Sequence, residues 1–111
     1  MSYDVSLLSG EGRAIDRAKL SAYLTSLGLV SDATDHFVFL DSGKICADAD
    51  LVWTEDDEDR AETGDAVNCI QVHIPYALCE SHSTVVLQTC EKLASHFDLR
   101  VYDEQEGKYL R

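Results

Sequence analysis

The chain has 111 residues and is strongly acidic, with 21 Asp and Glu against 9 Lys and Arg and a formal net charge of −12. Such a charge repels nucleic acid and anionic membrane surfaces, and it attracts basic partners. An apolar fraction of 45% and a single proline argue against a disordered chain. The length predicts one domain, residues 1–111, which can bury enough apolar surface to fold without disulfides or metal.

The first residues of the sequence, its hydropathy and its cysteines indicate the cellular compartment that we expect. Residues 1–8 carry no basic region and no long apolar run, so no secretory signal is predicted. No stretch approaches the roughly 18 apolar residues of a membrane-spanning helix. We therefore expect a cytoplasmic protein whose cysteines are reduced and behave as small buried apolar residues rather than forming two disulfides. These cysteines are Cys46, Cys69, Cys79 and Cys90.

Two elements are predicted near the N-terminus. Apolar and polar residues alternate over 3–7, which is the period of a half-buried strand. The following helix is predicted with Asp16 as its N-cap and Gly28 just past its end. Its apolar face consists of Leu20, Tyr23, Leu24 and Leu27.

The middle of the chain gives one clear strand and one ambiguous segment. Residues 36–40 are predicted as a strand with two apolar faces, and 41–44 as a turn in which Gly43 takes positive φ. The segment that follows is ambiguous: residues 44–47 fit a strand that pairs back as a hairpin, and residues 51–53 fit an edge strand or a loop anchor. Residues 54–66 are predicted as an acidic surface loop.

The second half is predicted as strand, helix and strand. In 68–74, Ile70, Val72 and Ile74 face one way and the intervening residues, including His73, face the other. A helix follows with a core stripe of Val86, Cys90, Leu93 and Phe97. Its start is open in the sequence: Ser81 and Ser83 are both candidate N-caps, and residues 76–80 are either a loop or the first turn. Residues 99–102 form a last long strand, and 109–110 return as a short edge pairing.

The resulting order is β, α, β, (β), β, α, β. This order predicts an α+β domain of the ferredoxin-like, split β-α-β type, a two-layer sandwich in which two helices cover one face of an antiparallel sheet.

The acidic run after the ambiguous segment is the strongest candidate for a binding surface. Between residues 48 and 65 nine carboxylates accompany a single basic residue, Arg60. Trp53 lies at the start of this run and could anchor an interface, since Trp is enriched among binding hot spots. The predicted partner-binding residues are therefore Trp53, Glu55, Asp56, Asp57, Glu58 and Asp59. A solvated loop that only keeps the protein soluble is the alternative.

A metal site and a catalytic cysteine are two further hypotheses that the sequence raises. His73, Cys79, His82, Cys90 and His96 fall within a short stretch, and Cys79-x-x-His82 has a spacing found in zinc sites. No second close pair completes four ligands. Cys79 with His82 could also form an activated thiol near a helix start, but no other catalytic signature accompanies them.

A calcium site is a separate hypothesis. Asp48-x-Asp50 begins like a calcium-binding loop, but the sequence lacks the later ligands of such a loop. We therefore assign no catalytic residue, no metal and no cofactor.

These observations predict a small acidic cytosolic protein-binding module. Its most concrete form is an immunity or antitoxin protein that inhibits a basic protein such as a nuclease toxin, with carboxylates occupying the site meant for substrate phosphates. One alternative is a small-ligand or metal-binding domain, or a minor enzyme, that uses Cys79 and His82. Another is a homodimer built on an exposed edge or face of the sheet.

Overall fold

The computed structural model describes residues 2–10, 13–33, 35–41, 43–52 and 66–110, and for residues 2, 66 and 76–82 it describes the course of the backbone. Within these residues the elements follow one another as β1 (Ser2–Ser9), β2 (Ile15–Asp16), α1 (Arg17–Ser26), β3 (Val30–Ala33), β4 (His36–Asp41), β5 (Lys44–Val52), β6 (Ala66–Val67), β7 (Cys69–Pro75), α2 (Tyr76–Phe97), β8 (Leu99–Asp103) and β9 (Lys108–Tyr109).

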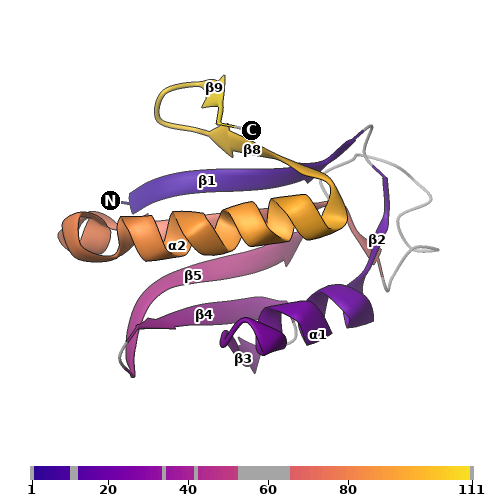
Figure 1. Cartoon of the computed structure of the whole chain (residues 1–111), viewed down its shortest axis with the longest axis horizontal. Helices are drawn as coiled ribbons and strands as arrows, with labels where there is room; N and C mark the ends of the chain where they lie inside the picture. Colours follow the sequence, from indigo (N-terminus) through magenta and orange to yellow (C-terminus); the bar gives the residue numbers. More distant parts are fainter. Residues whose placement is uncertain (1, 11–12, 34, 42, 53–65, 111) are drawn as a thin grey trace.

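Seven of these strands form one antiparallel sheet in the order β3-β4-β5-β7-β1-β8-β9 (Figure 1). The short strands β2 and β6 pair with each other beside it. β1, the first strand, lies inside the sheet between β7 and β8. No helix in the described ranges is long and apolar enough to cross a membrane.

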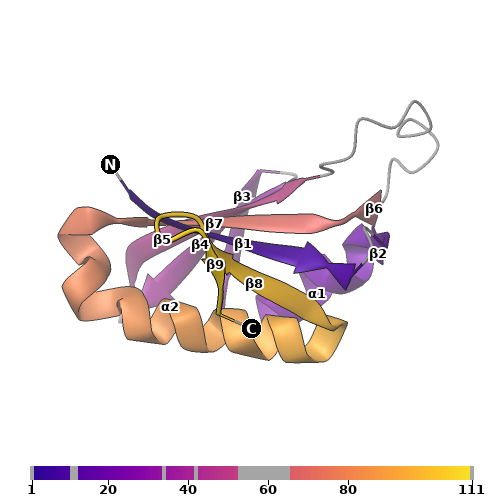
Figure 2. The same ribbon diagram turned by 90° about the horizontal axis from the view of Figure 1, so that it is seen from above.

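Both helices lie on the same side of the seven-stranded sheet, and no described element lies against its other side (Figure 2). The predicted α+β class, with an antiparallel sheet and two helices on one face, is therefore confirmed. The sheet is larger than the ferredoxin-like arrangement usually has.

The helix α1 agrees closely with the helix predicted from the sequence. The side chain of Asp16 accepts a hydrogen bond from the N–H of Ala18, which confirms the predicted N-cap. Leu20 and Leu24 are fully buried. Gly28 has a φ of 95°, a left-handed conformation that suits the residue after a helix.

The helix α2 begins at the earliest of the predicted alternatives. It starts at Tyr76, directly after Pro75, so residues 76–80 belong to the helix and neither Ser81 nor Ser83 is its N-cap. Proline suits this place because it lacks the N–H that the first helical turn leaves unbonded. Val86, Cys90 and Leu93 are buried as predicted, and Phe97 packs against them at the edge of the core.

The ambiguous segment is a strand of nine residues, β5. Its antiparallel pairing with β4 confirms the predicted hairpin return of residues 44–47. It lies between β4 and β7, so it is neither an edge strand nor a loop. Its Ala47, Ala49 and Leu51 are buried under the helices, and a register shift opposite Phe39 and Leu40 separates this alternating part from the β4–β5 turn. Gly43 in that turn has a φ of 80°, as predicted. The edge strand β3 was not predicted.

A buried carboxylate fastens the last strands to the first. Asp103 is 1% exposed, and it accepts hydrogen bonds from the Tyr3 hydroxyl and from the N–H groups of Gln105 and Glu106. Burial alone would raise the pKa of Asp103, but these bonds lower it below its ordinary value of 3.8. The ionised carboxylate thereby holds the turn between β8 and β9.

Candidate functional site

The face of the sheet turned away from the helices carries a band of histidine and aspartate side chains. Strand alternation places them there: where Ala47 and Ala49 turn into the core, the side chains of Asp48 and Asp50 turn outward. On β7 the same alternation buries Val72 and turns His73 outward, as predicted.

The antiparallel register brings these side chains together from strands that are far apart in sequence. Asp4 on β1 is opposite His73 on β7, and His73 is in turn opposite Asp48 on β5. His36 on β4 is opposite Asp50. Residues directly opposite one another on a sheet are close enough for their side chains to interact.

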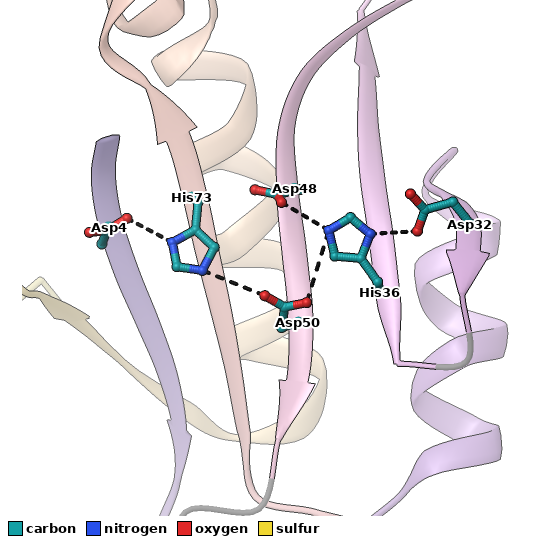
Figure 3. Close-up of polar contacts among 6 residues, drawn as sticks. All are labelled: Asp4, Asp32, His36, Asp48, Asp50 and His73. Carbon is teal, nitrogen blue, oxygen red and sulfur yellow. Dashed lines mark hydrogen bonds and ion pairs between the residues drawn. The ribbon is translucent and has the colours of Figure 1, made fainter. Parts of the chain in front are cut away.

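His36 is held on both sides of its ring (Figure 3). Its Nδ1 lies 2.5 Å from an oxygen of Asp32 on β3, and its Nε2 lies 2.9 Å from Asp48. A second carboxylate, Asp50, is 3.9 Å from the same Nε2. The side chain of His36 is 28% exposed.

His73 is arranged in the same way on the other side of β5. Its Nδ1 lies 2.7 Å from Asp4, and its Nε2 lies 3.6 Å from Asp50. Asp50 therefore lies between the two rings, with one carboxylate oxygen toward each (Figure 3). We call these six residues the His–Asp cluster; its members are Asp4, Asp32, His36, Asp48, Asp50 and His73.

The carboxylates favour the protonated form of both rings. Hydrogen bonds with Asp48 and then Asp32 raise the pKa of His36 from 6.5 to about 9. Burial would lower the pKa of His73, but the bond to Asp4 and the nearby carboxylates outweigh it and raise the pKa. Even with both rings protonated, the four carboxylates leave the cluster net negative.

Two other features of the open face adjoin the cluster. A wide, open hollow of about 470 Å³ is lined by His36, Asp50, Gln71 and Asp35 among others. Three apolar side chains at the β3–β4–β5 end of the sheet are exposed, and we call them the apolar patch: Val30, Leu40 and Ile45. Leu40 and Ile45 are directly opposite each other on β4 and β5.

The residues singled out from sequence have different fates. Trp53 and Glu55, Asp56, Asp57, Glu58 and Asp59 lie outside the described residues, as does nearly all of the acidic loop predicted at 54–66. Cys79 and His82 lie on α2 in the stretch whose backbone alone is described.

The described members of the histidine and cysteine group do not form one site. His73 faces outward from the sheet, whereas Cys90 is buried in the core on the helix side. His96 stacks on Tyr23 with ring centroids 4.0 Å apart. Cys46, Cys69 and Cys90 are buried free thiols, as predicted. As the side chains stand, no three His, Cys, Asp or Glu donors among the described residues surround a metal position.

Sequence reasoning missed the cluster, although part of its signal was present. The stretch Ala47-Asp48-Ala49-Asp50-Leu51 alternates small or apolar with charged residues, which is the pattern of a half-buried strand. Reading Asp48 and Asp50 as the start of the acidic run concealed that alternation.

No protein-family model, no curated protein and no solved structure matches the chain. Its function therefore has to be inferred from the site itself.

Proposed function

We propose that this protein is a small cytoplasmic protein-binding module that docks a basic protein on the open face of its sheet. The observation that supports this most directly is the His–Asp cluster, which places four carboxylates on a sheet face that no described element covers. The overall charge of −12 favours a basic partner over any other class of macromolecule.

The open face combines two properties that protein interfaces use. The carboxylates supply a negative field that accelerates encounter with a basic partner, by about 10- to 1000-fold for strong steering. The apolar patch offers side chains that a partner can desolvate, and Ile45 is 62% exposed. We expect the charges to govern the association rate and the apolar patch to govern residence time.

The specific form of the proposal is an immunity or antitoxin protein. In that role the carboxylates would occupy the phosphate-binding site of a basic toxin such as a nuclease. Trp53 and the run from Glu55 to Asp59 remain part of this proposal as a second contact region. We also infer that β5, β7, β1 and β8 with the two helices constitute a ferredoxin-like unit that the outer strands extend; the sheet order around β1 supports this inference.

The test compares baits that differ in where charge is removed. One bait carries Asp48→Asn with Asp50→Asn. Its matched control removes two exposed charges from the other side of the molecule, Glu91→Gln with Asp98→Asn; Asn is chosen because residue 98 has a left-handed backbone. A further bait carries the amide replacements of residues 55–59.

Partners captured at low salt are identified by mass spectrometry, and the purified partner is then measured kinetically against each bait. We expect one basic protein whose association rate falls with salt and falls at least about 10-fold in the Asp48/Asp50 variant, and much less in the control. Equal binding to the face variant and the control would refute docking through the open face. Recovery of no partner specific to the wild type would refute the binding module.

A further inference from the structure

One carboxylate of the His–Asp cluster, that of Asp50, keeps unused hydrogen-bonding capacity. The other three carboxylates each form a hydrogen bond with a histidine ring; these are Asp4, Asp32 and Asp48. Asp50 makes two longer contacts, 3.9 Å to Nε2 of His36 and 3.6 Å to Nε2 of His73 (Figure 3). Both distances exceed the length of a hydrogen bond. Within the described part of the chain, each oxygen of Asp50 is therefore still able to accept a donor.

The second carboxylate at the hollow is already paired. Asp35 lies in the turn between β3 and β4, and its Oδ1 is 2.9 Å from Nε of Arg17 on α1. A guanidinium of the chain itself therefore balances the charge of Asp35. Among the described residues that line the hollow, Asp50 is the acceptor left for a cation that arrives from solvent.

The neighbours of Asp50 in the hollow are an amide and apolar surface. Gln71 on β7 is directly opposite Asp50 on β5, so the two side chains lie next to each other on the open face. The Gln71 amide forms no hydrogen bond with any other described residue. Ala33 and Val52 line the same hollow. The hollow thus presents a carboxylate, an amide oxygen and apolar side chains together.

Arginine is the side chain that matches this combination. Its planar guanidinium carries five N–H donors in a fixed fork, which suits the two oxygens of a carboxylate and a neighbouring amide oxygen. Its methylene groups pack favourably on apolar side chains such as Ala33 and Val52. The ammonium of lysine is a compact and strongly hydrated charge, so it gains less from acceptors held side by side.

The charges around Asp50 favour a cation even when both histidine rings are protonated. The three carboxylates bonded to the rings already outnumber the rings, and Asp50 adds a further negative charge. The side chain of Asp50 is 40% exposed, so solvent and salt screen the repulsion between the rings and an incoming guanidinium.

Resting on the proposed docking function, we propose that the hollow receives one arginine side chain of the basic partner, its guanidinium bonded to the carboxylate of Asp50 and to Oε1 of Gln71. Asp50 and Gln71 are then the short-range anchor of the interface, and the other carboxylates act chiefly through their long-range field. The site selects arginine over lysine, which a negative field alone does not do.

The experiment is an NMR titration of the whole protein at pH 7 and low salt with N-acetyl-arginine amide, and then with the corresponding derivatives of lysine and citrulline. The signals followed are the side-chain amide of Gln71 and the backbone N–H groups around it. We expect saturable shifts with arginine, and an affinity at least about 5-fold higher than for lysine. Citrulline, which has nearly the shape of arginine without its charge, should give no saturable shift.

Three variants locate the site. Asp50→Asn should weaken arginine binding about 10- to 100-fold, and Gln71→Met about 3- to 10-fold, because they remove a charged and a neutral acceptor. Asp32→Asn is the matched control: it removes the same charge from the same cluster, but Asp32 bonds Nδ1 of His36 and does not line the hollow. It should weaken arginine binding less than about 3-fold. Thermal unfolding verifies that each variant is folded.

Absence of saturable arginine binding, or equal affinity for arginine and lysine, would overturn the proposal. So would equal losses in Asp50→Asn and Asp32→Asn, because the general charge of the face would then account for the binding. These outcomes are distinct from failure of the docking function. A protein that selects arginine but captures no basic partner retains the site and loses the docking function, and capture of a basic partner without arginine selection shows the reverse.

Discussion

Nε2 of His36 on β4 lies 2.9 Å from the carboxylate of Asp48 on β5, so an ion pair links these two neighbouring strands. Together with the pairing of His73 and Asp4, this contact ties four strands of the sheet on the face that the helices leave uncovered. The cluster is therefore a source of stability as well as a candidate surface for binding.

Stability should fall as pH rises through the range in which these histidines lose their protons. The fold raises the pKa of His36 from 6.5 to about 9, so its stabilising contribution is fully present below 6.5 and is lost as pH rises to about 9. The raised pKa of His73 acts in the same direction. We expect a loss of about 1 kcal/mol, because solvent screens such exposed pairs.

Urea unfolding across this pH range measures the effect. His36→Gln should flatten the pH dependence, whereas His96→Gln should leave it unchanged. Identical curves for wild type and His36→Gln would show that the His36 pairs do not stabilise the fold. Unfolded thiols, whose ordinary pKa is 9.0, also ionise toward the upper end of this range, and because they do so in every variant, the effect of His36 is the difference between the curves.

Removal of the buried carboxylate at the β8 turn should be costly. Asp103→Ala leaves the donors of Tyr3, Gln105 and Glu106 without their acceptor, and we expect a loss of about 2–4 kcal/mol in the free energy of unfolding. Tyr3→Phe removes one of those bonds and should cost about 1–2 kcal/mol.

Denaturant unfolding measures both losses, with Tyr109→Phe as the control. Tyr109 is 47% exposed, so its change should stay within about 0.5 kcal/mol. Because the fold lowers the pKa of Asp103, its contribution is present above pH 3.8 and should be lost as pH falls below that value. An Asp103→Ala protein as stable as the Tyr109→Phe control would contradict the anchoring role of this carboxylate.

The described thiols should resist chemical labelling in the native protein. Burial raises the pKa of Cys69 to about 11 and that of Cys90 to about 12, so almost none of either is the reactive thiolate at neutral pH. We expect alkylation of these two cysteines to be at least about 100-fold slower in buffer than in urea. Peptide mass spectrometry resolves each site, and rapid native labelling of Cys90 would show that the core opens readily.

Side chains on the open face should differ sharply in how much they contribute to the free energy of unfolding. Ile45 is 62% exposed and Val38 is 8% exposed. Ile45→Ser should therefore change the free energy of unfolding by no more than about 0.5 kcal/mol. Val38→Ser should cost about 1–3 kcal/mol. Chemical denaturation of the two variants provides the comparison, and a large loss for Ile45→Ser would make Ile45 a stability residue and weaken its role in docking.

Sequence patterns predicted the elements in which periodicity and end signals agree. The structure contains the predicted strand that alternates up to Leu7 and the predicted strand that contains Ile70 and Ile74. It also contains the predicted helix with Asp16 as its N-cap and with Leu20 and Leu24 on its buried face. Each of these elements can be predicted from local sequence alone, because the apolar stripe of a helix and the alternation of a strand are patterns of neighbouring residues.

The cluster could not be predicted in full because its geometry depends on sheet order. His36 and His73 become neighbours of Asp50 only because β5 lies between β4 and β7, and no local pattern specifies that order. β5 was also obscured by its composition, since Ala and Asp are poor strand formers whose presence here is decided by tertiary packing. The sequence left the start of α2 open between Tyr76 and Ser83, because a proline such as Pro75 can end a strand or precede a helix.

The interior position of β1 has a consequence for how this protein is made. Both strands that pair with β1 come from the last part of the chain, whereas β3, β4 and β5 are consecutive and pair with one another. During synthesis the three-strand meander can form early, while Val5 and Leu7 wait with both sides of their strand unpaired until β7 and β8 have left the ribosome. Long-range pairings of this kind slow folding and expose apolar strand edges in the meantime. Chaperone dependence and inclusion-body formation should therefore respond more to substitutions in β1 than to equally buried ones in β4.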